Sequence, residues 1–244
     1  SCQPTGGIPG GGGGSIDIIG TPGWPPSGPR SDPTRSLSPV GHRESLWYDT
    51  LPEEVRVEGE PMEGAVTCDT VIVGGGLTGL WTALYLLERE PGMDVVVIDR
   101  TGVGTGASGR NGGWCSTLLP MSLDRMARQH GRAAARRTQV AMHSTLDEIE
   151  RVVTEHDIDA GFRRGGAITA ARSAPQEGRI AHEISRYREF GFEEDDYRLL
   201  DADEAANRCA MTRIRGALYT PHCAAAHPAR LPHGVARLAV AAGA

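Results

Sequence analysis

The stretch VIVGGGLTGL, residues 71–80, decides how this sequence of 244 residues is interpreted. A short apolar run, Thr70–Val73, leads into a GxGxxG pattern, and apolar residues then recur at helical spacing over Thr78–Arg89. A strand that turns on glycines into a helix is typical of a dinucleotide-binding site. The pattern therefore predicts a turn whose free N–H groups and helix dipole hold a pyrophosphate.

Each glycine of this pattern has its own expected role. Gly74 makes the tight turn out of the strand, Gly76 lets the backbone approach the pyrophosphate, and Gly79 lets the helix pack closely on the sheet. The predicted cofactor contacts of the turn are completed by Gly75, Leu77 and Thr78.

A second strand and an acidic residue complete the motif. The apolar run Val95–Ile98 reads as a buried parallel strand, and Asp99 follows it about 20 residues after the glycines. A carboxylate at this place accepts hydrogen bonds from the adenosine ribose and would repel the 2′-phosphate of NADP. Arg100 weakens the argument against NADP and is itself a candidate contact. The predicted fold class is α/β, with a right-handed strand–helix–strand unit at residues 70–99.

A glycine-rich flavin loop, predicted at residues 104–116, favours FAD over NAD. Its segment GASGRNGG, residues 106–113, follows the ribose-binding strand, and small residues there allow close backbone approach and an anion nest. A flexible surface loop is the alternative. Arg110 could pair with a phosphate or a carboxylate, or cap its own turn. The candidate contacts are Gly106, Ala107, Ser108, Gly109, Arg110 and Asn111.

Composition narrows the classes of partner. The net charge of −6 argues against nucleic acid or an anionic membrane surface. Arg128, Arg132 and Arg136 recur at i, i+4 spacing and would share one solvated helix face. There is no apolar run of the roughly 18 residues that a spanning helix needs, and the N-terminus lacks a secretory pattern. Five scattered cysteines read as reduced thiols, so the expected location is the cytoplasm.

Two regions differ in kind. Residues 1–44 are rich in Gly and Pro and are expected to be a disordered leader, whereas residues 45–244 have the character of a packed domain. The chain stops where the last expected helix meets a glycine and a strand would normally follow, so an incomplete domain is expected. The expected helices are Ser45–Leu51 (a short helix or packed arm), Leu123–His156, Pro175–Phe190, Asp201–Asn207 and Pro228–Ala242, and the expected later strands are Gly165–Ala171 and Gly216–Thr220.

Several of these stretches together resemble a known family. The pair Trp47-Tyr48 ahead of residues 69–79, followed by GASGRNGG, resembles the D-amino-acid-oxidase-like FAD-dependent oxidoreductases, especially their gamma-glutamylputrescine oxidase-like branch. The later stretches Gly216–Pro221 and His227–Leu231 are also similar to the family. The resemblance implies a glutathione-reductase-type Rossmann-like domain and, over residues 123–244, the start of an α+β substrate domain.

The resemblance also implies roles for residues. The glycine turn would hold the FAD pyrophosphate, Asp99 the ribose, and Ala107–Asn111 would run beside the pyrophosphate and flavin. The sequence departs from the family in having Asp99 where Glu is more usual and His227 where Asp or Asn is usual. Family members also continue well beyond the length of this chain.

The activity implied by the resemblance is oxidation of a C–N bond of a small amine or amino acid. Hydride would pass to flavin N5, with dioxygen as the acceptor. No catalytic base is assigned, because a neutral amine aimed at N5 needs no protein nucleophile. Two alternatives remain open: an NAD-dependent dehydrogenase, and a truncated flavin-binding fragment without catalysis.

Other reactive side chains carry no positive prediction. His222, Cys223 and His227 lie close in sequence with Cys209 upstream, but their spacing matches no standard zinc pattern, so no metal site is predicted. Cys115 follows the flavin loop, and packing is favoured there over a covalent flavin link.

Overall fold

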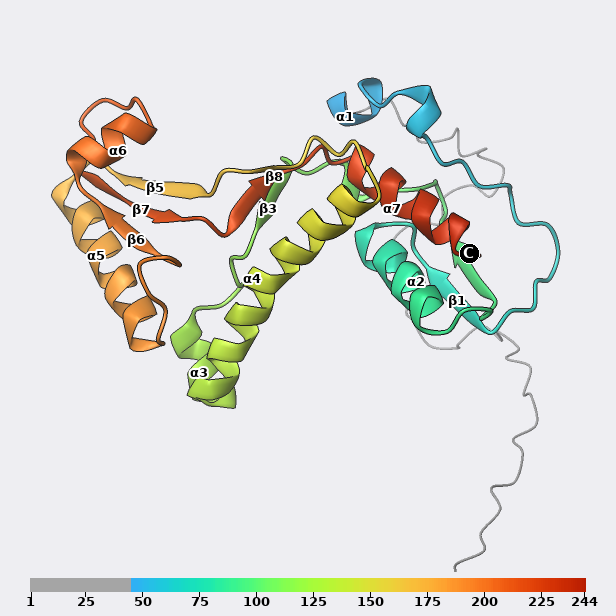
Figure 1. Cartoon of the computed structure of the whole chain (residues 1–244), viewed down its shortest axis with the longest axis horizontal. Helices are drawn as coiled ribbons and strands as arrows, with labels where there is room; N and C mark the ends of the chain where they lie inside the picture. Colours follow the sequence, from blue (N-terminus) through green and yellow to red (C-terminus); the bar gives the residue numbers. More distant parts are fainter. Residues whose placement is uncertain (1–44) are drawn as a thin grey trace, which may run out of the picture. The chain divides into compact units, whose positions relative to one another are not determined.

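The computed structural model describes residues 45–244, so the leader expected at residues 1–44 lies outside the described residues. The elements are shown in Figure 1. The helices are α1 (Leu46–Asp49), α2 (Leu77–Arg89), α3 (Leu123–His130), α4 (Arg132–Glu155), α5 (Ala174–Glu189), α6 (Ala202–Arg208) and α7 (Arg230–Ala241), with short 3-10 turns η2 (Glu53–Val55) and η3 (Ala107–Gly109). The strands are β1 (Thr70–Val73), β2 (Val95–Ile98), β3 (Trp114–Ser116), β4 (Arg163–Arg164), β5 (Ala167–Ala171), β6 (Arg198–Leu200), β7 (Gly216–Thr220) and β8 (Cys223–Ala225).

The predicted strand–helix–strand unit is present. β1 and β2 pair in parallel, from Thr70 opposite Val95 to Val73 opposite Ile98, and α2 connects them. The apolar stripe of α2 is buried and packs against α7. Leu80 and Leu84 of α2 share one core cluster with Val95 of β2 and Val235 of α7. Burial of this stripe supplies the main free-energy gain that holds the helix on the strands.

The face of β1 that carries Val71 and Val73 is exposed among the described residues. Val73 is 81% exposed and Val71 is 46% exposed, whereas Ile72, on the other face, packs against the core. Parallel sheets are ordinarily covered on both faces. Exposed valines on this face are typical of a sheet surface that packs against another layer of protein.

Two antiparallel sheets follow. β8 lies between β3 and β4, and β7 lies between β5 and β6. The pairing of β3 with β8 joins the end of the flavin loop to the segment that precedes α7, with Trp114 opposite Ala225. The strands β3, β4, β6 and β8 were absent from the sequence interpretation, because runs of two or three residues show no measurable alternation.

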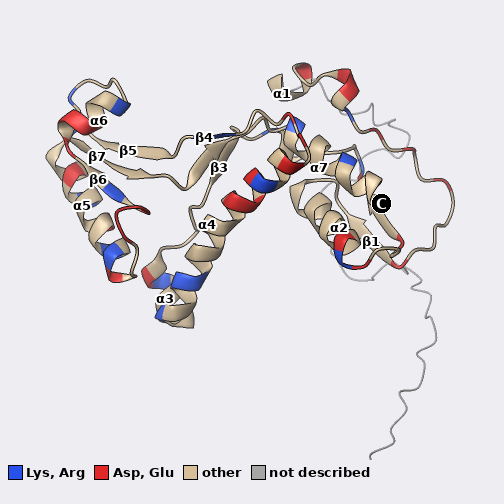
Figure 2. Ribbon diagram, in the orientation of Figure 1, with Lys and Arg blue, Asp and Glu red and all other residues tan. Residues whose placement is uncertain are grey.

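The prediction of one continuous helix over Leu123–His156 is wrong, because the segment forms two helices, α3 and α4. Gly131 has φ +85°, which ends α3 and starts α4 in a new direction. The shared arginine face is also wrong for this reason, since Arg128 lies on α3 and the other two on α4. The guanidinium groups of Arg132 and Arg136 lie over the rings of Phe190 and Phe192. Both signs of charge occur along α4 (Figure 2).

No described helix combines the length and apolar character needed to cross a bilayer.

Candidate functional site

The glycine turn lies at the junction of β1 and α2, as its spacing predicts. Gly74 has φ +117°, a conformation that side chains disfavour, and its N–H donates to the Ile98 carbonyl at 2.7 Å. Gly76 is the N-cap residue of α2 and provides no side-chain cap. A Cβ on Gly79 would overlap the Gly74 carbonyl oxygen and meet Ile72. Gly79 thus permits the close packing of helix on strand that its position predicts.

Asp99 follows β2 and faces this turn. Its Oδ2 accepts from the Gly75 N–H at 2.8 Å, and its Oδ1 accepts from the N–H groups of Thr101 at 2.8 Å and Gly102 at 3.0 Å. Partial burial would raise the pKa of Asp99, but these backbone hydrogen bonds outweigh it and lower the pKa below its usual value. The residue itself is exposed, so an ionised carboxylate is presented at the end of β2.

The flavin loop packs against the N-terminal end of α2. Ser108, in the turn η3, accepts from the Leu77 N–H at 3.0 Å, and the Gly104 N–H donates to the Gly75 carbonyl at 2.8 Å. The first-turn N–H groups of a helix have no partner within the helix, so they attract an acceptor or an anion. The structure brings the glycine turn, Asp99 and the loop together at one helix N-terminus.

The glycines of the loop serve two purposes. A Cβ on Gly104 or Gly109 would press on the Tyr48 side chain, and a Cβ on Gly113 would come 2.5 Å from the Ala226 carbonyl oxygen. Gly106 and Gly112 have open space where a Cβ would be. Gly104, Gly109 and Gly113 therefore make room for other parts of the protein, and the predicted cofactor contacts of the loop stay a prediction.

The remaining predicted contacts differ in exposure and partners. Arg110 is exposed, and its Nε donates to the Gly106 carbonyl at 3.4 Å. This contact closes the turn of the loop and involves no carboxylate. The Asn111 side chain donates to the carbonyls of Ala107 and Ser108 and so closes the turn. Three other candidates, Thr78, Arg100 and Ala107, are exposed, with Thr78 in the first turn of α2.

His227 shows how the sequence accommodates its departure from the family pattern. Its Nδ1 accepts from the N–H groups of Ala229 at 3.3 Å and Arg230 at 3.2 Å, at the start of α7. An Asp or Asn side chain caps a helix in the same way. Burial, with a smaller effect of the Arg230 charge, lowers the pKa of His227 and keeps Nδ1 free to accept. The substitution therefore keeps the cap.

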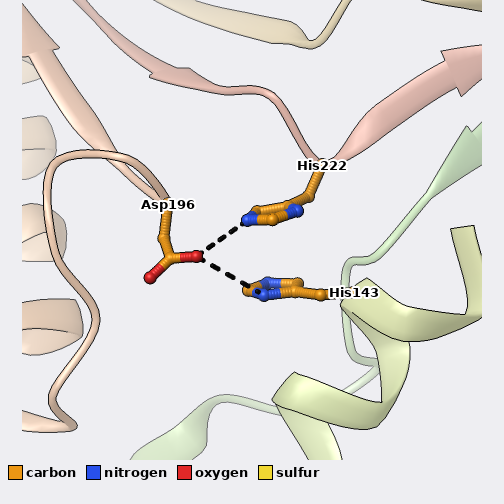
Figure 3. A group of neighbouring side chains, drawn as sticks. All are labelled: His143, Asp196 and His222. Carbon is orange, nitrogen blue, oxygen red and sulfur yellow. Dashed lines mark hydrogen bonds and ion pairs between the residues drawn. The ribbon is translucent and has the colours of Figure 1, made fainter. Parts of the chain in front are cut away.

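A cluster that the sequence interpretation missed joins α4, the segment before β6 and the β7–β8 connection (Figure 3). His222 Nε2 lies 2.9 Å from Asp196 Oδ1, and His143 Nδ1 lies 3.8 Å from the same oxygen. The two imidazole rings stack with centroids 3.6 Å apart and an angle of 7° between planes. Residues so far apart in sequence give no local signal of this contact, whereas Cys209, Cys223 and His227 lie near His222 in the sequence.

The His143–Asp196–His222 cluster has ligand atoms within 4.8 Å of one another, but its geometry disfavours a metal ion. An imidazole nitrogen binds metal along a lone pair in the ring plane, and parallel stacked rings direct these lone pairs along lines that do not converge. In addition, the Gln139 amide N–H₂ donates to the Thr117 carbonyl and faces His143 Nε2 at 3.2 Å. His143 Nε2 also lies 2.9 Å from the Tyr197 hydroxyl, and these two donors facing one nitrogen favour the tautomer that carries its proton on Nδ1, toward Asp196.

Acid should weaken the protein through this cluster. Burial, reinforced by the neighbouring His222, lowers the pKa of His143 to about 4, against an unfolded value near 6.5. Between these values the unfolded chain binds more protons than the folded one, so this contribution is complete above pH 6.5 and is lost as the pH falls toward 4. We expect a loss of up to about 3 kcal/mol in the free energy of unfolding.

Urea unfolding at pH 7 and pH 4.5 measures this loss. The decrease in the free energy of unfolding between the two pH values should be smaller in His143→Gln than in wild type. His182→Gln changes an exposed histidine of α5 and should show the wild-type decrease. An equal drop in wild type and His143→Gln would contradict the assignment.

Cys115, near the end of the flavin loop, is a packing residue. Cys115 lies on β3, is half-buried and contacts the core cluster that includes α2 and α7. Burial, with a smaller effect of Cys223, raises the pKa of its thiol and so disfavours the nucleophilic thiolate. Cys223 accepts a hydrogen bond from the Trp114 ring N–H.

One family matches most of this chain. The family described as FAD dependent oxidoreductase (DAO) matches residues 69–244. Gamma-glutamylputrescine oxidoreductase of Escherichia coli is 32% identical over 177 residues, which is 72% of this chain and 40% of that protein. Among solved structures, glycine oxidase from Bacillus cereus aligns with a TM-score of 0.55 at 22% identity, covering 72% of this chain and 45% of that one. L-amino acid deaminase from Proteus vulgaris aligns with a TM-score of 0.60 at 19% identity, covering 76% of this chain and 46% of that one.

The chain spans less than half the length of each of these relatives. The solved structures, at this level of identity, support the fold alone.

Proposed function

The chain belongs to the DAO family of FAD-dependent oxidoreductases, and from that premise we propose that residues 45–244 are the N-terminal part of an enzyme that oxidises a C–N bond of a small amine or amino acid. FAD is the cofactor of this family. The proposed domain division assigns the strand–helix–strand unit at 70–99 and the flavin loop at 104–116 to cofactor binding. Residues 123–244 would then begin the substrate domain within a glutathione-reductase-type Rossmann-like fold.

The observation that carries the proposal is the convergence at the N-terminus of α2. A diphosphate needs N–H donors, the positive end of a dipole and a close backbone approach, and the first turn of α2, Gly76 and Ser108 supply these. The ribose needs an acceptor, and the ionised Asp99 supplies it within the same turn. In the loop, a Cβ on Gly106 or Gly112 would meet nothing within 4 Å. The donor set of the chain therefore fits the adenosine diphosphate part of FAD.

The proposed substrate class draws support from the relatives. Their names refer to gamma-glutamylputrescine, glycine and L-amino acids, and the name oxidase of one supports dioxygen as the acceptor. Bound FAD would accept the hydride equivalents at N5 and pass them on. The proposed role of the described residues is to bind and orient FAD. The glycine turn and Ser108 would hold the phosphates, and Asp99 would hold the sugar.

A complete active site is proposed to need more polypeptide than these residues contain. The chain covers 40–46% of the relatives compared above, and the face of β1 that carries Val71 and Val73 is bare among the described residues. A covering layer would shield this face and complete the flavin environment.

Flavin binding tests the proposal directly. The purified chain is expected to bind FAD, seen as the visible flavin absorbance that persists after gel filtration, and not to bind NAD in a parallel titration. Asp99→Ala should weaken FAD binding by about 1.5–3 kcal/mol, the usual worth of hydrogen bonds to a charged group.

The matched control is Asp195→Ala, which removes an exposed carboxylate from the segment between α5 and β6. It should bind FAD as wild type does. A colourless protein that binds NAD would overturn the proposal in favour of a dehydrogenase. Unchanged affinity in Asp99→Ala would remove that residue from the site.

A further inference from the structure

We propose that the N-terminal arm, residues Ser45–Leu51, is a strap that holds the flavin loop against α2, with Tyr48 as its central positioning residue. The inference rests on the proposed function, because it is there that the loop is assigned to FAD. It adds a determinant of cofactor affinity that lies outside the glycine turn and the loop themselves.

Three side chains of the arm donate hydrogen bonds to backbone carbonyls of the loop region. The Tyr48 hydroxyl donates to Val103 at 2.6 Å, the Ser45 hydroxyl to Gly109 at 3.3 Å, and the Trp47 ring N–H to Asn111 at 2.8 Å. These carbonyls lie just before, within and just after the turn η3. Fixing the backbone at both ends of a short turn restricts its conformations and lowers the entropy that ligand binding would otherwise cost.

The Tyr48 side chain also packs closely against two glycines of the loop. A Cβ on Gly104 would lie 3.0 Å from Pro232 and 3.2 Å from the Tyr48 hydroxyl. A Cβ on Gly109 would overlap the Gly104 carbonyl oxygen and lie 3.0 Å from the Tyr48 ring. Tyr48 is only 5% exposed. Burial, with a smaller effect of the Asp99 charge, raises its pKa to about 12, so the hydroxyl keeps the proton that it donates.

The arm is itself anchored on the start of α7. Tyr48 and Leu51 share a buried cluster with Ala229. Thr50 Oγ1 lies 3.1 Å from Nε2 of His227, the residue that caps α7. The Trp47 and His227 rings make an edge contact with centroids 5.1 Å apart. The strap therefore joins the loop to a helix of the main core.

The loop residues that contact α2 connect the position of Tyr48 to the proposed phosphate site. Ser108 contacts the Leu77 N–H and Gly104 contacts the Gly75 carbonyl. Loosening the loop at Tyr48 would thus displace Ser108 from the helix N-terminus. Tyr48 itself needs no contact with the cofactor for this role.

The test is the FAD affinity of Tyr48→Phe, measured by titrating apoprotein and following the flavin spectrum. Removing this one hydroxyl should raise the Kd for FAD about 3- to 10-fold, the range for a single hydrogen bond. Tyr85→Phe is the matched control, because the Tyr85 hydroxyl also donates one bond of 2.6 Å, to Glu148, away from the loop. Tyr85→Phe should leave the Kd unchanged, whatever it does to the melting temperature.

A double-mutant cycle with Ser108→Ala separates positioning from general destabilisation. If Tyr48 acts through Ser108, Tyr48→Phe should have a smaller effect in the Ser108→Ala background, whereas Tyr85→Phe combined with Ser108→Ala should be additive. Additivity in both cycles, or a wild-type Kd in Tyr48→Phe, would overturn the inference.

Hydrogen exchange of the amides of residues 104–111 provides a readout without FAD. Tyr48→Phe should exchange there faster than wild type and Tyr85→Phe. If wild type binds no FAD, the proposed function fails, and faster exchange would then keep the strap only as a structural contact. If the amides of residues 104–111 exchange at the same rate in Tyr48→Phe and wild type, the inference is wrong whether or not FAD binds.

Discussion

Gly79→Ala is expected to destabilise the fold by about 3 kcal/mol or more, although alanine is the better helix former by about 1 kcal/mol. The new Cβ would overlap the carbonyl oxygen of Gly74, which is backbone and cannot rotate away. Gly74 is fixed in turn by its hydrogen bond to the Ile98 carbonyl. Relief would require α2 to move off β1 and to open the core around Leu80 and Leu84.

Urea unfolding followed by circular dichroism measures this effect. Gly178→Ala is the matched control, since it also replaces a helical glycine, on α5, but has nothing within 4 Å of the new Cβ. It should stabilise the protein by about 0.5–1 kcal/mol. If both substitutions were stabilising, the close packing at Gly79 would be wrong.

Gly76→Val is expected to fold but to lose FAD. Gly76 has φ −85° and ψ 177°, an extended conformation that valine adopts readily, so no backbone strain results. The Cβ would lie 3.0 Å from Ser108 Oγ, and the two methyl groups would occupy the space at the N-terminus of α2. A diphosphate would lose both the close approach and the Ser108 position, so the Kd for FAD should rise about 100-fold or more.

The comparison is with Gly59→Val, where a Cβ meets nothing within 4 Å. That variant should retain FAD, and both variants should keep the wild-type melting temperature within a few degrees. Stoichiometric FAD in purified Gly76→Val would show that the pyrophosphate does not approach this turn.

The two glycine substitutions separate two functions within one motif. Gly79 is required by the protein, since its missing Cβ makes room for the Gly74 carbonyl and Ile72, whereas a Cβ on Gly76 would meet only the Ser108 side chain. A motif read from the sequence assigns both to dinucleotide binding. The structure distinguishes the glycine that packs against backbone from the glycine that faces one side chain of the loop.

The sequence by itself determined the parts governed by neighbouring residues. The boundaries of β1 and β2 agree with the structure, and α2 begins one residue before the expected start. These elements follow from apolar spacing and from glycine at a positive φ, both of which act over a few residues. The family resemblance came from the same local motifs, and the family match confirms it.

Only the tertiary structure decided which distant residues meet. It brought Tyr48 against Gly104 and Gly109, placed Arg128 apart from the arginines of α4, and gathered His143 with Asp196 and His222. These contacts depend on loop closure and on side-chain packing between segments far apart in the chain, so no short stretch of sequence encodes them.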